Sequence, residues 1–230
     1  LEQLRIRGET VNAARLYQLF VDAWLNRDDG KHQLNPRHKR LLMEDLAAAV
    51  WSSGEKSWTA DRLEDWLDEF LDAHSKIENA YATKDRTVLK EDLRTATFVV
   101  RPTGDEQGFR FAHSSLQEYF LACRLRRGLC DGATVACELP LPSVETLDFL
   151  GQLLQLATDK ERAAARKSLE QVLGGECLPG AVLAFRYWLL ARERGYLTPS
   201  SPVVQLAGAN LEEWTIAGTA AQPLRLTGAN

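Results

Sequence analysis

The chain has 230 residues, a net charge of −4 at neutral pH and a hydrophobic fraction of 45%. These values are typical of a globular protein with room for one large domain or two small ones. The slight acidity gives no case for a general affinity for nucleic acid, which usually needs a basic surface. No run of about 18 apolar residues is present, so we expect no membrane-spanning helix, and no signal peptide is visible.

Helical patterns fill the first part of the chain. Apolar residues recur every three or four positions over residues 10–25, 36–51 and 59–71, and residues 88–93 read as a short helix. The polar stretch 26–35 contains a glycine and is expected to be a loop.

The pattern then changes from helix to strand. Residues 97–101 are β-branched and apolar, residues 102–108 have a turn composition, and residues 109–113 alternate between apolar and polar. We expect these residues to form a β-hairpin. The order helix, helix, short helix, hairpin is typical of a winged-helix domain, which we assign to residues 36–130. Residues 1–35 would form a helical segment before it.

The most informative stretch, residues 109–122, places His113 between a strand and a helix. Ser115 and Glu118 have the spacing of a capping box, in which each side chain bonds the backbone amide of the other. We therefore expect a helix over residues 116–127 that ends at the following glycine. The residue types leave two interpretations of His113, a structural residue packed beneath the helix or a sensor of a ligand.

A helical domain is expected over residues 131–202. Ser143 can cap its first helix, while Thr158 and Glu161 form a second capping box. The chain has four cysteines without a Cys-x-x-Cys pair, so we expect reduced, mostly buried thiols of a cytosolic protein rather than a zinc site. These are Cys123, Cys130, Cys137 and Cys177.

Residues 203–230 have an apolar residue at every fifth position, with Ala221 in one of the places. A period of five fits neither a helix nor a flat strand, but it fits a square β-coil with one inward residue per side. Such a coil needs stacked neighbours to build its core, so we expect this segment to begin a longer repeat. The apolar positions are Leu206, Leu211, Ile216 and Leu226.

Several segments resemble the bacterial NACHT-type STAND NTPases. Residues 15–25 resemble the helix that follows the nucleotide-binding core of that family, residues 46–51 resemble the opening helix of its winged-helix domain, and residues 203–230 resemble the start of a pentapeptide-repeat domain. The most specific likeness is to the winged-helix signature, which this chain matches at Phe111, His113, Leu116, Gln117, Glu118, Tyr119, Phe120 and Ala122.

The resemblance implies a nucleotide switch. In the resting state the winged helix would close over ADP in the protein's own NTPase domain, with His113 near the β-phosphate, and the γ-phosphate of ATP would crowd that position. An imidazole can donate a hydrogen bond to phosphate. The resemblance further implies ADP or ATP with magnesium as cofactors of the full-length protein. It also implies an unknown sensed ligand, self-association on activation and a cytoplasmic signalling role in defence against phage.

The chain also departs from the family. It contains no GxxxxGK[ST] phosphate loop and no acidic magnesium motif after an apolar strand. The catalytic half of such an NTPase is therefore expected to lie outside this sequence, and we do not expect this fragment to be an enzyme.

Other functions remain open on the residues alone. One is a DNA-binding winged helix whose recognition helix, residues 87–93, offers Lys90 but also Glu91 and Asp92, which are unfavourable next to phosphates. Another is a plain protein-interaction scaffold. A hydrolase is not expected, because the four histidines are scattered and no Gly-x-Ser-x-Gly motif is present.

Overall fold

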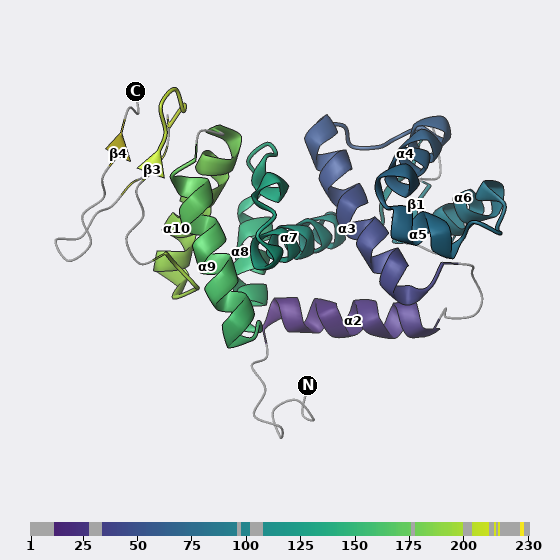
Figure 1. Cartoon of the computed structure of the whole chain (residues 1–230), viewed down its shortest axis with the longest axis horizontal. Coiled ribbons are helices and arrows are strands. Elements are labelled where there is room, and N and C mark those ends of the chain that lie inside the picture. The colour runs from purple at the N-terminus through teal and green to yellow at the C-terminus, as the bar shows by residue number, and fades with distance from the viewer. Residues whose placement is uncertain are drawn as a thin grey trace, which may run out of the picture. The chain divides into compact units, whose positions relative to one another are not determined.

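The computed structural model describes residues 12–27, 34–95, 98–101, 108–175, 178–199, 204–211, 214, 216 and 226–227. These residues are mostly helical, as predicted, with a small antiparallel hairpin. In chain order (Figure 1), the helices are α2 (Ala13–Arg27), α3 (Pro36–Ser53), α4 (Ala60–Ala73), α5 (Ser75–Ala80), α6 (Arg86–Thr95), α7 (Ser114–Asp131), the 3-10 helix η1 (Thr134–Cys137), α8 (Val144–Gln155), α9 (Asp159–Leu173) and α10 (Leu178–Arg194). The strands are β1 (Val99–Val100), β2 (Arg110–Phe111), β3 (Val204–Gln205) and β4 (Leu226–Thr227).

The chain divides into two compact units. One comprises Leu1–Leu16 with Ala122–Asn230, and the other comprises Tyr17–Leu121. Helices α2 and α7 therefore each contribute residues to both units. The predicted domain boundaries after residues 35, 130 and 202 follow composition rather than contacts, and they stay predictions. Among the helices that the structure describes, none is both long and apolar enough to span a membrane.

Local sequence signals set the helix starts in the Tyr17–Leu121 unit. The side chain of Asn35 accepts a hydrogen bond from the amide of His38, 2.8 Å away, and Pro36 occupies the first turn of α3. Thr59 caps α4 in the same way by accepting from the amide of Arg62. The predicted starts of both helices are therefore confirmed. The apolar faces of α3 and α4 are buried at Leu42, Met43, Leu46, Leu63, Leu67, Phe70 and Leu71.

A small sheet follows α6. Strands β1 and β2 pair antiparallel, with Val99 opposite Phe111, which confirms the predicted hairpin. Trp58, between α3 and α4, forms a further antiparallel bridge with Phe109 through backbone hydrogen bonds of 2.9 and 2.6 Å. Gly108 permits this approach, because a Cβ there would lie 3.0 Å from the carbonyl oxygen of Trp58, and its φ of 148° disfavours other residues.

Helix α7 differs from its prediction at both ends. It begins at Ser114 rather than after Ser115 and continues through Gly128 to Asp131. Gly128 does not end the helix but lets η1 approach it, because a Cβ at this position would lie only 2.3 Å from the Cβ of Ala136. A helix-terminating glycine and a glycine at a close contact look alike in sequence, which explains the error.

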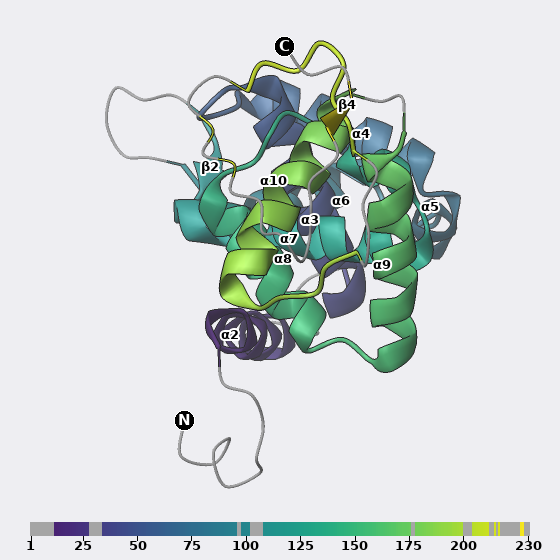
Figure 2. The same cartoon turned by 90° about the vertical axis from the view of Figure 1, so that its left-hand side faces the viewer.

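Helices α8, α9 and α10 are neighbours in the unit that comprises Leu1–Leu16 and Ala122–Asn230 (Figures 1 and 2). The predicted caps are confirmed, since Ser143 accepts from the amide of Thr146 and Thr158 forms a capping box with Glu161. Helix α10 ends before Gly195, which has a φ of 69°. The core residues of these helices include Leu147, Leu150, Leu154, Leu169, Leu173, Leu183, Phe185 and Tyr187.

The described part of residues 203–230 forms a parallel strand pair rather than a β-helix. Val204 lies opposite Leu226, and Gln205 lies opposite Thr227. Leu206 is fully buried, in agreement with the inward position that the pentad register gives it, whereas Leu211 is only half-buried. Ile216 is also half-buried, Leu226 belongs to β4, and Ala221 lies outside the described residues.

Candidate functional site

His113 lies between the hairpin and α7, where the sequence places it. Phe111, two residues earlier, is buried, while His113 is exposed immediately before the first residue of α7. Alternation along β2 directs Phe111 into the core, and the chain then turns into the helix. The structure therefore presents this imidazole to solvent at the N-terminus of an 18-residue helix.

The His113 ring is held by Ser115. Its Nδ1 accepts a hydrogen bond from the Ser115 amide, 3.1 Å away, and lies 2.6 Å from the Ser115 hydroxyl oxygen. The hydroxyl of Tyr17, in α2, donates to the same Ser115 oxygen over 2.6 Å. These contacts join three side chains that come from two distant parts of the sequence.

The structure gives Ser115 a further partner, and the capping box that the sequence pattern predicts for Ser115 and Glu118 stays a prediction. A capping box would place Ser115 just outside the helix, with its hydroxyl accepting from the amide of Glu118. Because α7 already includes Ser114, Ser115 lies inside the first turn, and His113 takes the position before the helix. The imidazole Nδ1 then accepts from an amide of the first turn, as a capping oxygen usually does.

The hydrogen bonds also indicate which tautomer the ring adopts. A backbone amide can only donate, so the Nδ1 that accepts from Ser115 carries no proton. In the neutral ring the proton is then on Nε2. The exposed face of His113 therefore offers a hydrogen-bond donor, which suits an anionic oxygen better than a cation.

Aromatic packing beneath His113 anchors the start of α7. Tyr119 and Phe120 are almost fully buried, and the ring centroids of Tyr17 and Tyr119 lie 5.5 Å apart. The ring centroid of Phe120 lies 5.4 Å from that of Phe98 and 6.2 Å from that of Phe111. Phe111, Leu116, Tyr119 and Phe120 of this stretch are thus buried, while Phe109 is half-buried. Their packing limits movement of the helix that carries the histidine.

Tyr17 is the residue of this site that sequence reasoning missed. It lies 98 positions before Ser115 in the chain, and its aromatic ring fits the apolar pattern of an ordinary amphipathic helix. No local signal identifies a hydroxyl that finds its partner only when α2 and α7 come together.

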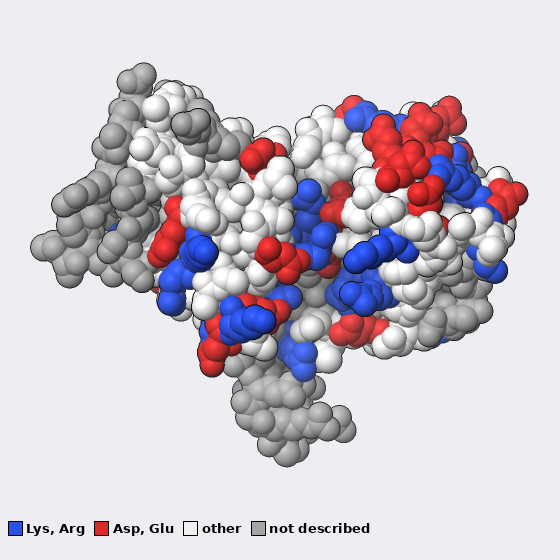
Figure 3. All heavy atoms as spheres, viewed as in Figure 1, with Lys and Arg blue, Asp and Glu red and all other residues white. Residues whose placement is uncertain are grey.

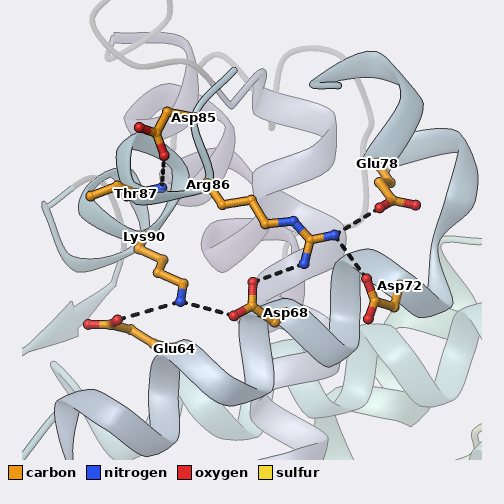
Figure 4. Close-up of polar contacts among 8 residues, drawn as sticks. All are labelled: Glu64, Asp68, Asp72, Glu78, Asp85, Arg86, Thr87 and Lys90. Carbon is orange, nitrogen blue, oxygen red and sulfur yellow. Dashed lines mark hydrogen bonds and ion pairs between the residues drawn. The ribbon is translucent and has the colours of Figure 1, made fainter. Parts of the chain in front are cut away.

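A second cluster of charges joins α6 to α4 and α5 (Figure 4). The guanidinium of Arg86 donates to Asp68, Asp72 and Glu78 over 3.1, 3.0 and 2.8 Å. The ammonium group of Lys90 lies 2.9 Å from a carboxylate oxygen of Asp68 and 3.6 Å from one of Glu64. Two cations of α6 thus face four carboxylates.

This cluster affects the DNA-binding alternative. Lys90 belongs to the helix that would enter a DNA groove, yet it pairs with α4. Acidic side chains gather over α4 (Figure 3), where Asp61, Asp65 and Glu69 are exposed. Carboxylates at this position would repel a phosphate backbone, so the charges disfavour α6 as a recognition helix.

The described residues contain no group of three or more His, Cys, Asp and Glu side chains that could hold a metal ion. Cys123, Cys130 and Cys137 are free thiols, and Cys177 lies outside the described residues. Partial burial raises the pKa of Cys130, which makes this thiol a weaker nucleophile at neutral pH.

Comparisons with known protein families, with curated proteins and with solved structures found no match to this chain.

Proposed function

We propose that this chain is the regulatory, sensor side of a nucleotide-switched signalling NTPase. His113 would donate a hydrogen bond from Nε2 to a phosphate oxygen of ADP, and that ADP would be held by an NTPase domain outside this sequence. The observation that carries the proposal is the exposed imidazole at the start of α7, whose Nδ1 is already occupied as an acceptor.

Two further features support an anionic ligand at this position. The N-terminus of a helix carries a partial positive charge that favours phosphate. The preceding elements support this proposal, since α3, the Trp58 bridge, α4, the short α5, α6 and the β1–β2 hairpin have the order of a winged helix with one added short helix. In a domain of this kind the histidine follows the last strand of the wing, which suits it to contact a ligand on a neighbouring domain.

The proposed switch follows from the size of the nucleotide. The winged helix would close on ADP, and the γ-phosphate of ATP would crowd His113 and favour release. A ligand can shift such an equilibrium only by its difference in affinity for the two states. Magnesium and the nucleotide would be bound by the NTPase domain. Release would then permit self-association, in a cytoplasmic signalling role that extends to defence against phage.

The C-terminal residues have a separate place in the proposal. We infer that the parallel pairing of β3 with β4 is a contact within a pentapeptide-repeat coil. The buried Val204, Leu206 and Ala209 support an inward apolar face. Such a domain would contribute the sensing or scaffolding surface.

The test is ADP retention by the full-length protein. His113→Ala should weaken ADP binding about 10- to 100-fold, since a hydrogen bond to a charged group contributes roughly 1.5–3 kcal/mol. His113→Gln keeps an N–H donor and should retain part of the affinity. His38→Gln, which alters a half-buried histidine of the same unit, is the control. Unchanged nucleotide content in His113→Ala, measured by chromatography after denaturation, would show that His113 is only structural.

DNA binding remains the alternative. A gel-shift experiment at low salt separates the two proposals, because tight binding of this chain to any duplex would favour DNA over a nucleotide switch. The pairing of Lys90 with Asp68 is the observation that places this alternative second.

A further inference from the structure

We propose that Tyr17 is a positioning residue for His113. The hydroxyl groups of Tyr17 and Ser115 form a two-step hydrogen-bond relay that ends on Nδ1 and holds the ring as the Nε2-protonated donor. The inference rests on the proposed function for its purpose, whereas the relay itself can be tested without a nucleotide.

The distances define the relay. The Tyr17 oxygen lies 2.6 Å from the Ser115 oxygen, which lies 2.6 Å from His113 Nδ1. Both donor–acceptor distances lie at the short end of the range for hydrogen bonds that a hydroxyl group donates. All three residues belong to the Tyr17–Leu121 unit.

The available protons determine which group donates and which accepts in each hydrogen bond of the relay. Nδ1 accepts from the Ser115 amide, so it carries no proton and cannot donate to the Ser115 hydroxyl. That hydroxyl has a single proton, and it accepts the proton of Tyr17. The Ser115 proton must therefore point to Nδ1, and every donor in the relay meets an acceptor.

Packing makes Tyr17 a fixed donor. The ring of Tyr17 lies 5.5 Å from that of Tyr119, with the two planes inclined by 33°, and Tyr119 is only 1% exposed. The half-buried ring of Tyr17 therefore packs on a buried ring, and this contact restricts the movement of its hydroxyl. Without it, the Ser115 hydroxyl could rotate away from Nδ1, and only the amide would still favour the same tautomer. We expect removal of Tyr17 to weaken the preference rather than abolish it.

The experiment measures the imidazole nitrogens of this chain by NMR, with histidine labelled with ¹⁵N. At about pH 8.5 an ordinary histidine is neutral, and the two nitrogen shifts report which one carries the proton. In the unmodified chain we expect an acceptor-type Nδ1 and a protonated Nε2 at His113. In Tyr17→Phe we expect the Nδ1-protonated fraction to rise about fivefold, which corresponds to the loss of one net hydrogen bond.

Tyr81→Phe is the matched control. The hydroxyl of Tyr81 lies 2.8 Å from Nδ1 of His38, so this variant should change the His38 signals and leave those of His113 unchanged. Ser115→Ala should produce at least the effect of Tyr17→Phe on His113, because it removes the middle of the relay. Circular dichroism verifies that each variant is folded.

Two results would overturn the inference: a protonated Nδ1 in the unmodified chain, or His113 shifts that do not differ between Tyr17→Phe and the Tyr81→Phe control. A changed tautomer in Tyr17→Phe supports the positioning role whatever the full-length protein retains. Unchanged ADP retention in His113→Ala would instead contradict the proposed function, so the two failures are distinguishable.

Discussion

Replacement of Gly128 by alanine tests whether α7 packs against η1 as closely as the structure indicates. The added Cβ would lie 2.3 Å from the Cβ of Ala136 and 3.1 Å from the carbonyl oxygen of Ala133. Ordinary contacts between carbon atoms are about 3.5–4.0 Å, so η1 would have to move. The amide of Ala133 also donates to the carbonyl of Gly128 over 2.8 Å, and a displacement would strain that bond.

The expected cost is the balance of two effects. Alanine is favoured over glycine in a helix interior by about 1 kcal/mol. Overpacking costs roughly 1–3 kcal/mol, and so severe an overlap belongs near the upper end. We therefore expect Gly128→Ala to lower the free energy of unfolding by about 2 kcal/mol.

A double-mutant cycle with Ala136→Gly isolates the overlap. Ala136→Gly alone should cost about 1.5 kcal/mol, from the buried methyl group and the added chain entropy. In that background the clash with the Cβ is absent, so Gly128→Ala should stabilise by up to about 1 kcal/mol. The coupling energy is then about 3 kcal/mol. Urea denaturation followed by circular dichroism gives all four values. If Gly128→Ala were no less stable than the unmodified chain, or if the coupling were below about 0.5 kcal/mol, the close packing would be refuted.

Three more predictions concern the polar contacts. Thr158→Ala should lower the free energy of unfolding by about 1 kcal/mol in urea denaturation, because it removes the cap of α9. Hydrogen bonds from the amide and hydroxyl of Thr158 lower the pKa of Glu161. The ionised Glu161 side chain therefore stabilises the fold fully above the ordinary glutamate pKa of about 4.3, and this stabilisation is lost as the pH falls through the lowered pKa. In acid denaturation, the difference in the free energy of unfolding between the unmodified chain and Glu161→Gln should therefore become smaller. Partial burial raises the pKa of Asp68, but hydrogen bonds from Lys90 and Arg86 lower it overall. The loss of stability in Asp68→Asn should accordingly be smaller at 1 M salt than at low salt, and equal losses would contradict an electrostatic origin.

The features that the sequence predicted well are local ones. Thr59, Ser143 and Thr158 each cap a helix through a bond to an amide a few residues away, so neighbouring residues suffice to find them. The hairpin was also predicted, because alternation around Phe111 and a polar turn are local signals.

The features that depend on distant contacts were missed. Ser115 has the spacing of a capping residue, but its hydroxyl accepts from Tyr17 and lies 2.6 Å from Nδ1 of His113, and α7 starts at Ser114. Gly128 was interpreted as a helix end because nothing nearby indicates the approach of η1. In the candidate site, His113 could be found from its neighbours, whereas Tyr17 required the fold.

The cluster around Arg86 has a consequence for how this chain can drift during evolution. One guanidinium serves three acceptors, so Asp72 or Glu78 can be replaced singly while the other contacts of Arg86 persist. Loss of the arginine removes all of them together, and of the two cations only Lys90 then pairs with Asp68. Positions 72 and 78 should therefore tolerate substitution one at a time. Position 86 should be restricted to a residue that can reach several carboxylates at once.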